Sequence, residues 1–379
     1  MKVLVISHEY PPIGGGGGKV VQDLCVGLAG RGHQIRLITA LWNGLPERET
    51  LGDLVIERLP SGRTQSFRAD LRAMAFFVWK SFWRGLKVIR AWQPDLIHAH
   101  FAVPAGAAAF ALSLFTHVPY IITAHGGDVP GGAPEKTSRW FRFVLPLSKP
   151  VWKHAAAIAA VSSQTRQLAM KHYTADVQVI PNGIDPSAYQ PGIFDPKKAP
   201  VIIYIGRFSP EKNALAVPQV LSTLKELEWE CVMLGDGPQM EDVRSLIRQN
   251  QLEQRFTLPG WVSADEVARW MEKSDILFMP SLRDAMPIAG LQGLAMGLAV
   301  VASEIGSIPD IVADNENGFL VAPGYLNGYT TAIKMLLEDH TLLENFRHRS
   351  NEKVSKFNMT DVISAYEALF QKAISRMRL

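Results

Sequence analysis

The sequence predicts an α/β fold of two domains, each built around a parallel sheet. Short apolar, β-branched runs alternate with longer amphipathic stretches, which is the pattern of successive βαβ units. The pattern restarts at residue 201, where a strand, a turn and a loop repeat the opening arrangement. A chain of 379 residues also exceeds one compact core and suits two domains of ordinary size with a cleft between them.

The first half of the chain contains seven expected strands and the second half contains six. They cover residues 3–6, 35–39, 54–57, 96–98, 120–123, 157–160, 177–180, 201–205, 231–234, 256–258, 276–279, 300–302 and 319–321. Residues 185–200 separate the halves and carry four prolines, which interrupt helices and mark a connector. We therefore assign residues 1–184 to an N-terminal domain and residues 185–359 to a C-terminal domain, followed by an amphipathic helix at residues 360–379.

The composition is that of a globular protein, with 47% apolar and 20% charged residues. A net charge of +3 gives no support for a nucleic-acid partner. Cys25 and Cys231 lie in apolar periodic segments, so we expect reduced core thiols, no disulfide and a cytoplasmic location. The apolar run at residues 3–6 is too short for a signal peptide, and residues 105–115 fall short of the ~20 residues of a membrane span.

A run of five glycines, residues 14–18, follows the first expected strand and precedes a helix expected to begin near Lys19. Glycines in this position let backbone amides approach an anion, and the helix N-terminus adds partial positive charge. Neither GK[ST] nor a GxGxxG followed by an acidic ribose clamp is present, which disfavours nucleoside triphosphates and dinucleotides. The alternative is a flexible connector without a ligand.

Arg207 and Lys212 follow the strand that opens the second half. An arginine and a lysine five positions apart across a proline turn can converge on one diphosphate and take the place of a divalent ion. The alternative is a solvated surface loop. Two further loops follow strands in the same way, at residues 235–238 and 280–288, and ligands collect at the carboxyl ends of parallel strands.

His125 and Asp128 follow another expected strand. A neutral imidazole there can bond a sugar hydroxyl, and the adjacent glycines leave backbone groups accessible. The alternative is a histidine that only bonds the backbone of a tight turn. A metal site would need His98, His100 and His125 together, but the sequence offers no clear further ligand and no Asp-x-Asp, so we expect none.

Further short motifs occur in a fixed order along nearly the whole chain. They are the PPxxGG-type opening at residues 11–16 and residues 31–33, 95–100, 125–126, 161–162, 181–185, 206–212, 235–238, 309–312 and 317–321. Together they resemble the family 4 retaining glycosyltransferases, also called glycosyl transferases group 1. The resemblance implies the GT-B fold, in which two Rossmann-like domains face each other across a cleft and the last helix packs back on the N-terminal domain.

The resemblance also implies a role for each loop. A nucleotide-sugar would be the co-substrate, with no cofactor and no metal. Arg207 and Lys212 would hold its diphosphate, His125 would contact the transferred sugar, and Asp284 would join them as a catalytic residue. The donor-binding set would be Gly15, Gly16, Gly17, Arg207, Lys212, Gly235, Asp284, Ala285, Met286, Pro287, Ile288 and Gln292. The acceptor would lie beside Gly16, Gly17 and Asp128.

One loop departs from the family pattern. The family usually has two glutamates eight positions apart, and this chain has Asp284 and Gln292 there. Ala285 and Pro287 replace glycines that commonly follow the first glutamate. Aspartate is one methylene shorter, and glutamine bonds a ribose diol without charge assistance. Either the donor is held differently or activity is reduced.

Residues 68–92 combine basic and aromatic side chains on one amphipathic segment, and residues 139–143 are of the same kind. Such segments favour an anionic bilayer surface. The alternative is that the aromatic side chains pack into the N-terminal domain while the charged ones face water. The bilayer interpretation favours a lipid-linked glycan as the acceptor and a peripheral position on the inner face of the membrane.

Three function classes remain open at this point. The first is a hexosyltransferase that moves a sugar from a UDP- or GDP-sugar to a glycan or lipid-linked glycan, in polysaccharide or glycolipid biosynthesis. The second is a nucleotide-sugar 2-epimerase of the same fold, which would need acidic groups in the cleft. The third is a catalytically weakened partner protein, for which Asp284 and Gln292 are the only argument.

Overall fold

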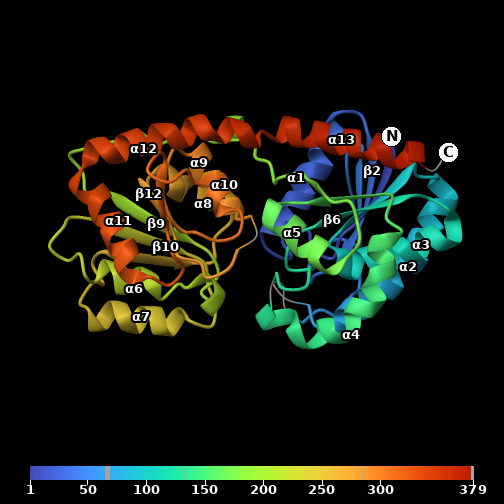
Figure 1. Cartoon of the computed structure of the whole chain (residues 1–379), viewed down its shortest axis with the longest axis horizontal. Coiled ribbons are helices and arrows are strands. Elements are labelled where there is room, and N and C mark those ends of the chain that lie inside the picture. The colour runs from blue at the N-terminus through green and yellow to red at the C-terminus, as the bar shows by residue number, and fades with distance from the viewer. Residues whose placement is uncertain (65–68, 133, 285, 377–379) are drawn as a thin grey trace. The chain divides into compact units, whose positions relative to one another are not determined.

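The computed structural model describes residues 1–64, 69–132, 134–284 and 286–376, without the side chains of residues 134–143. The chain forms two compact units (Figure 1). The first unit comprises Met1–Gly183 and Met359–Leu379, and the second comprises Ile184–Asn358. The sequence had placed this boundary between residues 184 and 185. Each unit is described by itself below.

The described part of the first unit contains a sheet in the order β3-β4-β2-β1-β5-β6-β7-β8. All neighbouring strands are parallel except β3 and β4, which form an antiparallel edge. The strands are β1 (Lys2–Ile6), β2 (Gln34–Ala40), β3 (Arg48–Leu51), β4 (Leu54–Leu59), β5 (Leu96–His100), β6 (Tyr120–Ala124), β7 (Ala157–Ala160) and β8 (Gln178–Val179).

Helices cover both faces of this sheet, because the alternate residues of each strand are apolar on both sides. Val3 and Val5 pack in one cluster with α1 and α13, whereas Leu4 and Ile6 pack in another with α2, α3 and α4. The helices are α1 (Gly16–Gly30), α2 (Leu71–Trp92), the π-turn η1 (Ala102–Gly106), α3 (Ala107–Thr116), α4 (Pro134–Lys153), α5 (Ser163–His172) and α13 (Met359–Arg376).

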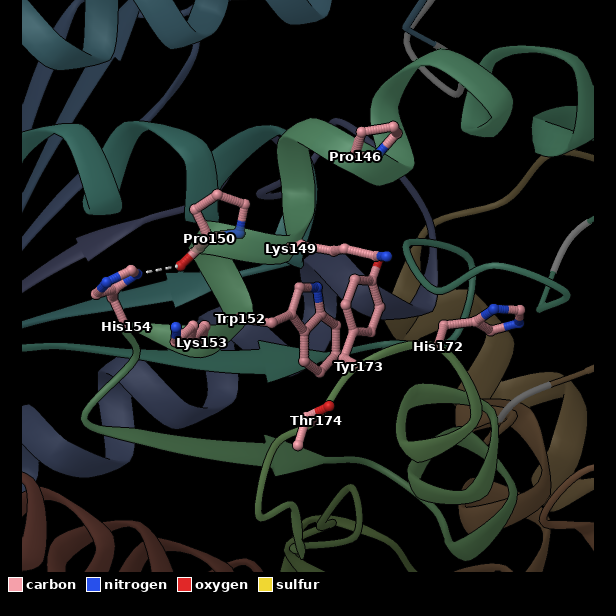
Figure 2. Close-up of a pocket in the computed structure, with 9 residues that line it drawn as sticks. All are labelled: Pro146, Lys149, Pro150, Trp152, Lys153, His154, His172, Tyr173 and Thr174. Carbon is pink, nitrogen blue, oxygen red and sulfur yellow. Dashed lines mark hydrogen bonds between the residues drawn. The ribbon is translucent and has the colours of Figure 1, made fainter.

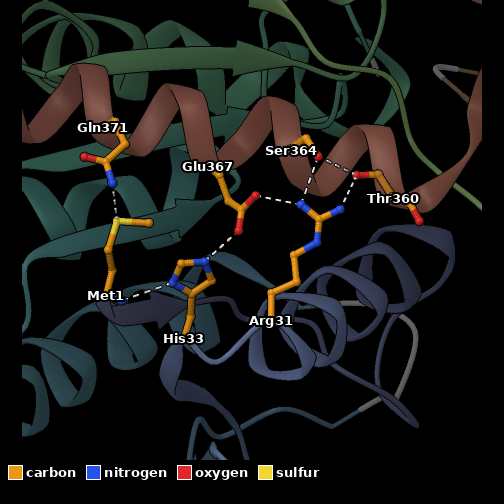
Figure 3. Close-up of polar contacts among 7 residues, drawn as sticks. All are labelled: Met1, Arg31, His33, Thr360, Ser364, Glu367 and Gln371. Carbon is orange, nitrogen blue, oxygen red and sulfur yellow. Dashed lines mark hydrogen bonds and ion pairs between the residues drawn. The ribbon is translucent and has the colours of Figure 1, made fainter.

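The last helix, α13, is held on the first unit by apolar packing and by polar contacts. Tyr366 and Phe370 are buried against the sheet. Figure 3 shows Glu367 between two basic side chains, at 2.6 Å from Arg31 Nη1 and 2.7 Å from His33 Nε2. Arg31 also donates to the carbonyl oxygen of Thr360 at 2.7 Å. The terminal segment therefore belongs to the N-terminal unit although it follows the second unit in sequence.

The second unit contains a wholly parallel sheet in the order β11-β10-β9-β12-β13-β14. Its strands are β9 (Val201–Ile205), β10 (Glu230–Leu234), β11 (Phe256–Gly260), β12 (Ile276–Met279), β13 (Ala299–Ser303) and β14 (Gly318–Val321). The helices are η2 (Pro186–Ala188), η3 (Pro210–Lys212), α6 (Ala216–Leu221), α7 (Met240–Gln249), α8 (Ala264–Glu272), α9 (Ile288–Ala295), α10 (Ile308–Ile311), α11 (Leu326–Glu338), α12 (His340–Lys353) and η4 (Val354–Phe357).

The expected strands are all present, with ends that differ by at most two residues. Two local expectations were wrong. Strand β3 was missed because its residues are mostly polar and exposed on an edge hairpin. Helix α1 begins at Gly16 rather than near Lys19, so the helix starts inside the glycine run. Cys25 and Cys231 are buried free thiols, as expected. Within the described residues, no helix has the length and apolar character of a membrane span.

Candidate functional site

The predicted site loops lie at the carboxyl ends of the strands in both units. In each sheet the strand order reverses between two central strands, β1 and β5 in the first unit and β9 and β12 in the second. Ligands of open parallel sheets bind outside the carboxyl ends at such a switch point. The loops after β1, β5 and β6 form one group in the first unit. The loops after β9, β10 and β12 form another group in the second unit.

The glycine run after β1 is shaped mainly by close packing. A Cβ on Gly14 would lie 2.5 Å from the Glu9 carboxylate, and one on Gly17 would lie 2.8 Å from the Phe101 ring. Gly14 also has a φ of +87°, which side-chain-bearing residues rarely adopt. Gly15 and Gly16 are exposed, and a Cβ on Gly15 would meet nothing within 4 Å. The glycine run is therefore an ordered, closely packed turn, and it leaves the start of α1 accessible to an anion.

Phe101, directly after β5, joins the glycine run to two histidines. Its ring lies 4.7 Å from the His8 ring and 4.3 Å from the His125 ring, measured between centroids. Its φ of 71° lies in the left-handed region, which costs a residue with a side chain about 1–3 kcal/mol. The fold holds Phe101 in this conformation, and its ring stays partly exposed among the site loops.

His125, after β6, belongs to what we call the imidazole cluster, which comprises His8, His98, His100 and His125. His125 Nε2 lies 3.1 Å from Nδ1 of His100, so one of these nitrogens carries the shared proton. The His98 and His100 rings are 4.1 Å apart, and His98 Nε2 bonds Thr123 Oγ1 at 2.8 Å. The sequence analysis had left open that His125 bonds only the backbone of its own turn. The structure shows a further partner, His100, at the end of the neighbouring strand β5.

Burial keeps the imidazole cluster neutral. It lowers the pKa of His8, His98 and His125 to about 3 each, and it lowers the pKa of His100 well below its usual value. The other imidazoles of the cluster add to this effect for His98 and His100. A neutral imidazole both donates and accepts, which suits a hydroxyl group.

Asp128 braces the loops that carry His125 and Phe101. Its carboxylate accepts from the backbone amide of His125 at 2.8 Å and from that of Ala102 at 2.5 Å. Burial raises the pKa of Asp128 to about 6, although these amide bonds oppose the shift. The residue is buried, so it positions the two loops, and its role in acceptor binding stays a prediction.

In the second unit, Arg207 lies in a turn whose backbone is closely packed against neighbouring residues. The Tyr204 hydroxyl donates to the carbonyl oxygen of Arg207 at 3.0 Å. A Cβ on Gly235 would lie 2.0 Å from the carbonyl oxygen of Gly206, and a φ of +133° likewise requires glycine there. Gly235 is therefore a packing residue that brings the loops after β9 and β10 together. A donor contact by its backbone stays a prediction.

Lys212 and Asp284 form an ion pair between the loops after β9 and β12. The amide of Leu282 donates to the Glu211 carbonyl oxygen at 2.9 Å, and Asn213 Nδ2 donates to the Pro280 carbonyl oxygen at 3.2 Å. These contacts fix both loops side by side. We call Arg207, Glu211, Lys212 and Asp284 the charged cluster. The Lys212 side chain is therefore paired with a carboxylate, and its role in binding a diphosphate stays a prediction.

The loop after β12 leads into α9, where the remaining predicted donor residues lie. Met286 and Pro287 are buried, and Ile288 begins the helix. Gln292 is also buried, and its amide nitrogen donates to the hydroxyl of Tyr189 at 3.2 Å. Ala285, between Asp284 and Met286, lies outside the described residues.

The three histidines that the sequence analysis considered as metal ligands bond other side chains. The His100 and His125 nitrogens bond each other, and His98 bonds Thr123. Over the described parts of the chain, no group of three His, Cys, Asp or Glu side chains is placed to hold a metal ion.

A separate cavity of about 440 Å³ opens between α4 and the end of α5. Figure 2 shows Trp152 and Tyr173 stacked along one side, with Lys149, Lys153 and His172 around it. None of the predicted site residues lines this cavity.

Sequence reasoning missed several residues in or beside the two clusters, namely His8, Glu9, Phe101, Tyr204 and Glu211. His8, Glu9, Tyr204 and Glu211 lie in or near β1 or β9, whose loops were already singled out, whereas Phe101 follows β5. Extending the search to the first two residues after the observed end of each strand would have found His8 and Phe101. His100 was considered only as a metal ligand, because its contact with His125 requires the register of β5 and β6.

Two family models match the chain in tandem, "Glycosyltransferase Family 4" over residues 14–188 and "Glycosyl transferases group 1" over residues 189–353. The chain is 24% identical to N-acetyl-alpha-D-glucosaminyl L-malate synthase of Bacillus anthracis, covering 98% of this chain and 97% of that protein. It is 23% identical to a glycogen synthase of Mycobacterium tuberculosis, covering 98% and 95%.

Solved structures share the fold over the full chain. A sucrose-phosphate synthase from Thermosynechococcus elongatus superposes with a TM-score of 0.86 at 18% identity, covering 99% of this chain and 100% of that one. Anabaena HepE in complex with UDP-glucose superposes with a TM-score of 0.77 at 18% identity, covering 100% of both chains. The predicted GT-B fold of two parallel-sheet domains is confirmed.

Proposed function

The chain belongs to the family 4, or group 1, glycosyltransferases of the GT-B fold, and from this we propose that it transfers a hexose from a nucleotide diphosphate sugar to an acceptor hydroxyl with retention of configuration. The charged cluster is the observation that carries the proposal. Arg207 and Lys212 both lie in the loop after β9, beside the switch point of a parallel sheet.

Breaking the glycosidic bond leaves a nucleoside diphosphate with more negative charge than it had in the donor. A guanidinium fork and an ammonium group placed at that diphosphate stabilise the transition state more than the ground state. In the absence of donor, the Asp284 carboxylate compensates the Lys212 ammonium. An incoming diphosphate would compete with Asp284 for Lys212, which would release the carboxylate toward the sugar.

The first unit supplies groups for the sugar and the acceptor. His125 is neutral at physiological pH and stands beside the partly exposed Phe101 ring, a combination that suits a sugar with its hydroxyls and apolar faces. Gly15 and Gly16 leave amides at the start of α1 open to the donor phosphates or to an acceptor hydroxyl.

The acceptor is a glycan or a lipid-linked glycan on this proposal. One relative is named as an N-acetyl-alpha-D-glucosaminyl L-malate synthase and another as a glycogen synthase, so the family includes different products and leaves the acceptor open. The solved complex of HepE with UDP-glucose supports beginning the donor search with UDP-sugars. The two buried free thiols agree with a cytoplasmic location, which stays a prediction.

The direct test measures nucleoside diphosphate release from a panel of UDP-, GDP- and ADP-sugars. Release from one class, stimulated by an acceptor extract, is expected for a transferase. Interconversion of two free nucleotide-sugars without release would instead identify a 2-epimerase. No turnover, but donor binding by calorimetry, would identify a weakened partner protein. Proton NMR of the product would show whether its anomeric configuration matches that of the donor.

A further inference from the structure

Helix α2 presents a stripe of aromatic and cationic side chains to solvent. The stripe, which we call the α2 stripe, consists of Arg72, Phe76, Trp79, Trp83, Lys87 and Arg90, all of them exposed. Spacings of three and four residues place these side chains on one side of the helix. At 1.5 Å per residue the stripe is about 27 Å long.

The sequence analysis left two interpretations of these aromatic residues, packing in the core and contact with a bilayer. Some of them are buried and others are exposed. Phe77 is buried in the core, and Phe82 and Trp92 pack partly against it. Trp79 and Trp83 are each 53% exposed. Core packing therefore accounts for one side of the helix and leaves the opposite side unexplained.

The end of α3 widens the exposed apolar surface beside the stripe. Phe115 is 71% exposed, and its ring lies 5.5 Å from that of Phe82. Leu114 next to it is 59% exposed. Large apolar side chains from two neighbouring helices thus form one patch, which exposed single residues would not.

The charge of this surface has one sign. Helix α2 carries five Lys and Arg residues and no Asp or Glu over 22 residues, in a chain whose net charge is only +3. The ammonium group of Lys80 lies 5.3 Å from the Phe76 ring and 5.2 Å from the Trp79 ring. Among the five cations of α2, Arg84 has a structural role, because it pairs with the buried carboxylate of Glu57. The side chains of residues 139–143, the second cluster singled out in the sequence, lie outside the described ones.

We propose that the α2 stripe docks the first unit onto the surface of an anionic lipid bilayer. Tryptophan rings with flanking Lys and Arg side chains suit the interface between headgroups and acyl chains. The core of a protein–protein interface is instead depleted of lysine. The docking is independent of the transfer chemistry proposed above and would hold the enzyme where lipid-linked acceptors reside.

The test is co-sedimentation of the full chain with vesicles of 3:1 phosphatidylcholine and phosphatidylglycerol, and with phosphatidylcholine alone. Binding is expected only to the anionic vesicles, and it should weaken as salt rises because screening shortens the reach of the charges. Lys87→Glu with Arg90→Glu should weaken binding by roughly 25-fold or more, since each cation near such a surface contributes about fivefold. Trp79→Ala with Trp83→Ala should weaken binding at every salt concentration.

Matched controls separate the stripe from general effects of charge and exposure. Arg166→Glu with Lys171→Glu reverses two exposed charges on α5 of the same unit, and Trp261→Ala removes a tryptophan that is 69% exposed in the second unit. Both controls should bind like the wild type. Arg84 is left intact so that the Glu57 pair is preserved.

Two outcomes would overturn the proposal. One is wild-type protein that does not sediment with anionic vesicles. The other is equal binding by the wild type and both stripe variants. If Trp79→Ala with Trp83→Ala converts a dimer to a monomer in analytical ultracentrifugation and vesicle binding is absent, the stripe is an interface between two copies instead. Circular dichroism and the melting temperature check that each variant is folded.

Discussion

The two units share a strand order but differ in the chemistry of their site loops. Setting aside the edge strands β3 and β8, both sheets place the third, second and first strands before the fourth, fifth and sixth. In the first unit the switch point carries buried neutral imidazoles, whereas in the second it carries the Lys212–Asp284 ion pair and Arg207. The comparison teaches that the scaffold fixes only where a ligand binds, and that the loops decide which ligand.

The difference has a physical meaning for recognition. Neutral imidazoles recognise hydroxyl groups through directional hydrogen bonds and would lose that ability if they became charged. A guanidinium and an ammonium recognise an anion by charge and depend little on its exact orientation. On the proposed function, the first unit would select the sugar and acceptor while the second would hold the leaving group.

The largest expected difference between the units is their response to acid. Each buried histidine of the imidazole cluster has a folded pKa below its unfolded value of about 6.5. The stability it contributes is therefore complete above pH 6.5 and is lost as the pH falls toward 3. Asp128, with a pKa raised to about 6, acts in the opposite direction and offsets part of the loss.

Between pH 7.5 and 5.5 the first unit should lose roughly 4 to 5 kcal/mol of unfolding free energy, at about 1.4 kcal/mol for each neutral histidine. Hydrogen exchange, corrected for the intrinsic effect of pH, would measure this. Peptides of β5 and β6 should lose protection at pH 5.5 while peptides of β9 and β12 retain it. Equal loss in both units would contradict the burial of the imidazole cluster.

The next effect concerns the charged cluster. Arg207→Ala and Lys212→Ala should each lower turnover by about 10²–10³-fold, equivalent to about 3–4 kcal/mol, which is typical when a charge-stabilising group is removed. Lys212→Ala also leaves Asp284 near the incoming phosphates without its cation. Initial rates at saturating donor measure this effect.

Lys225→Ala provides the matched control, because Lys225 is an exposed lysine of the same unit that bonds only the Asn250 carbonyl oxygen among its described contacts. This variant should turn over like the wild type. Rates within about threefold of wild type for Arg207→Ala and Lys212→Ala would show that the diphosphate is bound elsewhere.

The sequence predicted every strand except β3 and most of the charged cluster, but it predicted less of the imidazole cluster. Arg207 and Lys212 were found because both lie in one loop after one strand. The contact between His100 and His125 was not found, because it joins residues 25 apart at the ends of two neighbouring strands. The partner of Gln292 is 103 residues away, in the connector that sequence analysis treated only as a hinge.

The third prediction follows from that connector contact. If Gln292 holds the donor ribose, Gln292→Ala should weaken donor binding by about 0.5–1.5 kcal/mol, the net value of a neutral hydrogen bond. Tyr189→Phe removes the hydroxyl that accepts from the Gln292 amide, and it should weaken donor binding by less. Isothermal calorimetry with the donor identified by the panel measures both. Unchanged affinity in Gln292→Ala would place the ribose away from α9.

The smallest expected effect is that of a chelator, since we propose that the transfer needs no metal. Arg207 and Lys212 already supply positive charge in the loop after β9, and an ammonium beside the diphosphate would repel a dication. The Asp284 carboxylate, an acidic group beside this loop, is paired with that ammonium. Turnover in EDTA should equal turnover without it, whereas loss of activity that magnesium or manganese restores would contradict this. Performing the same assay on Lys212→Ala sharpens the comparison. If a metal partly rescued that variant but did nothing for the wild type, the ammonium would be acting in the place that a divalent ion occupies in metal-dependent transferases.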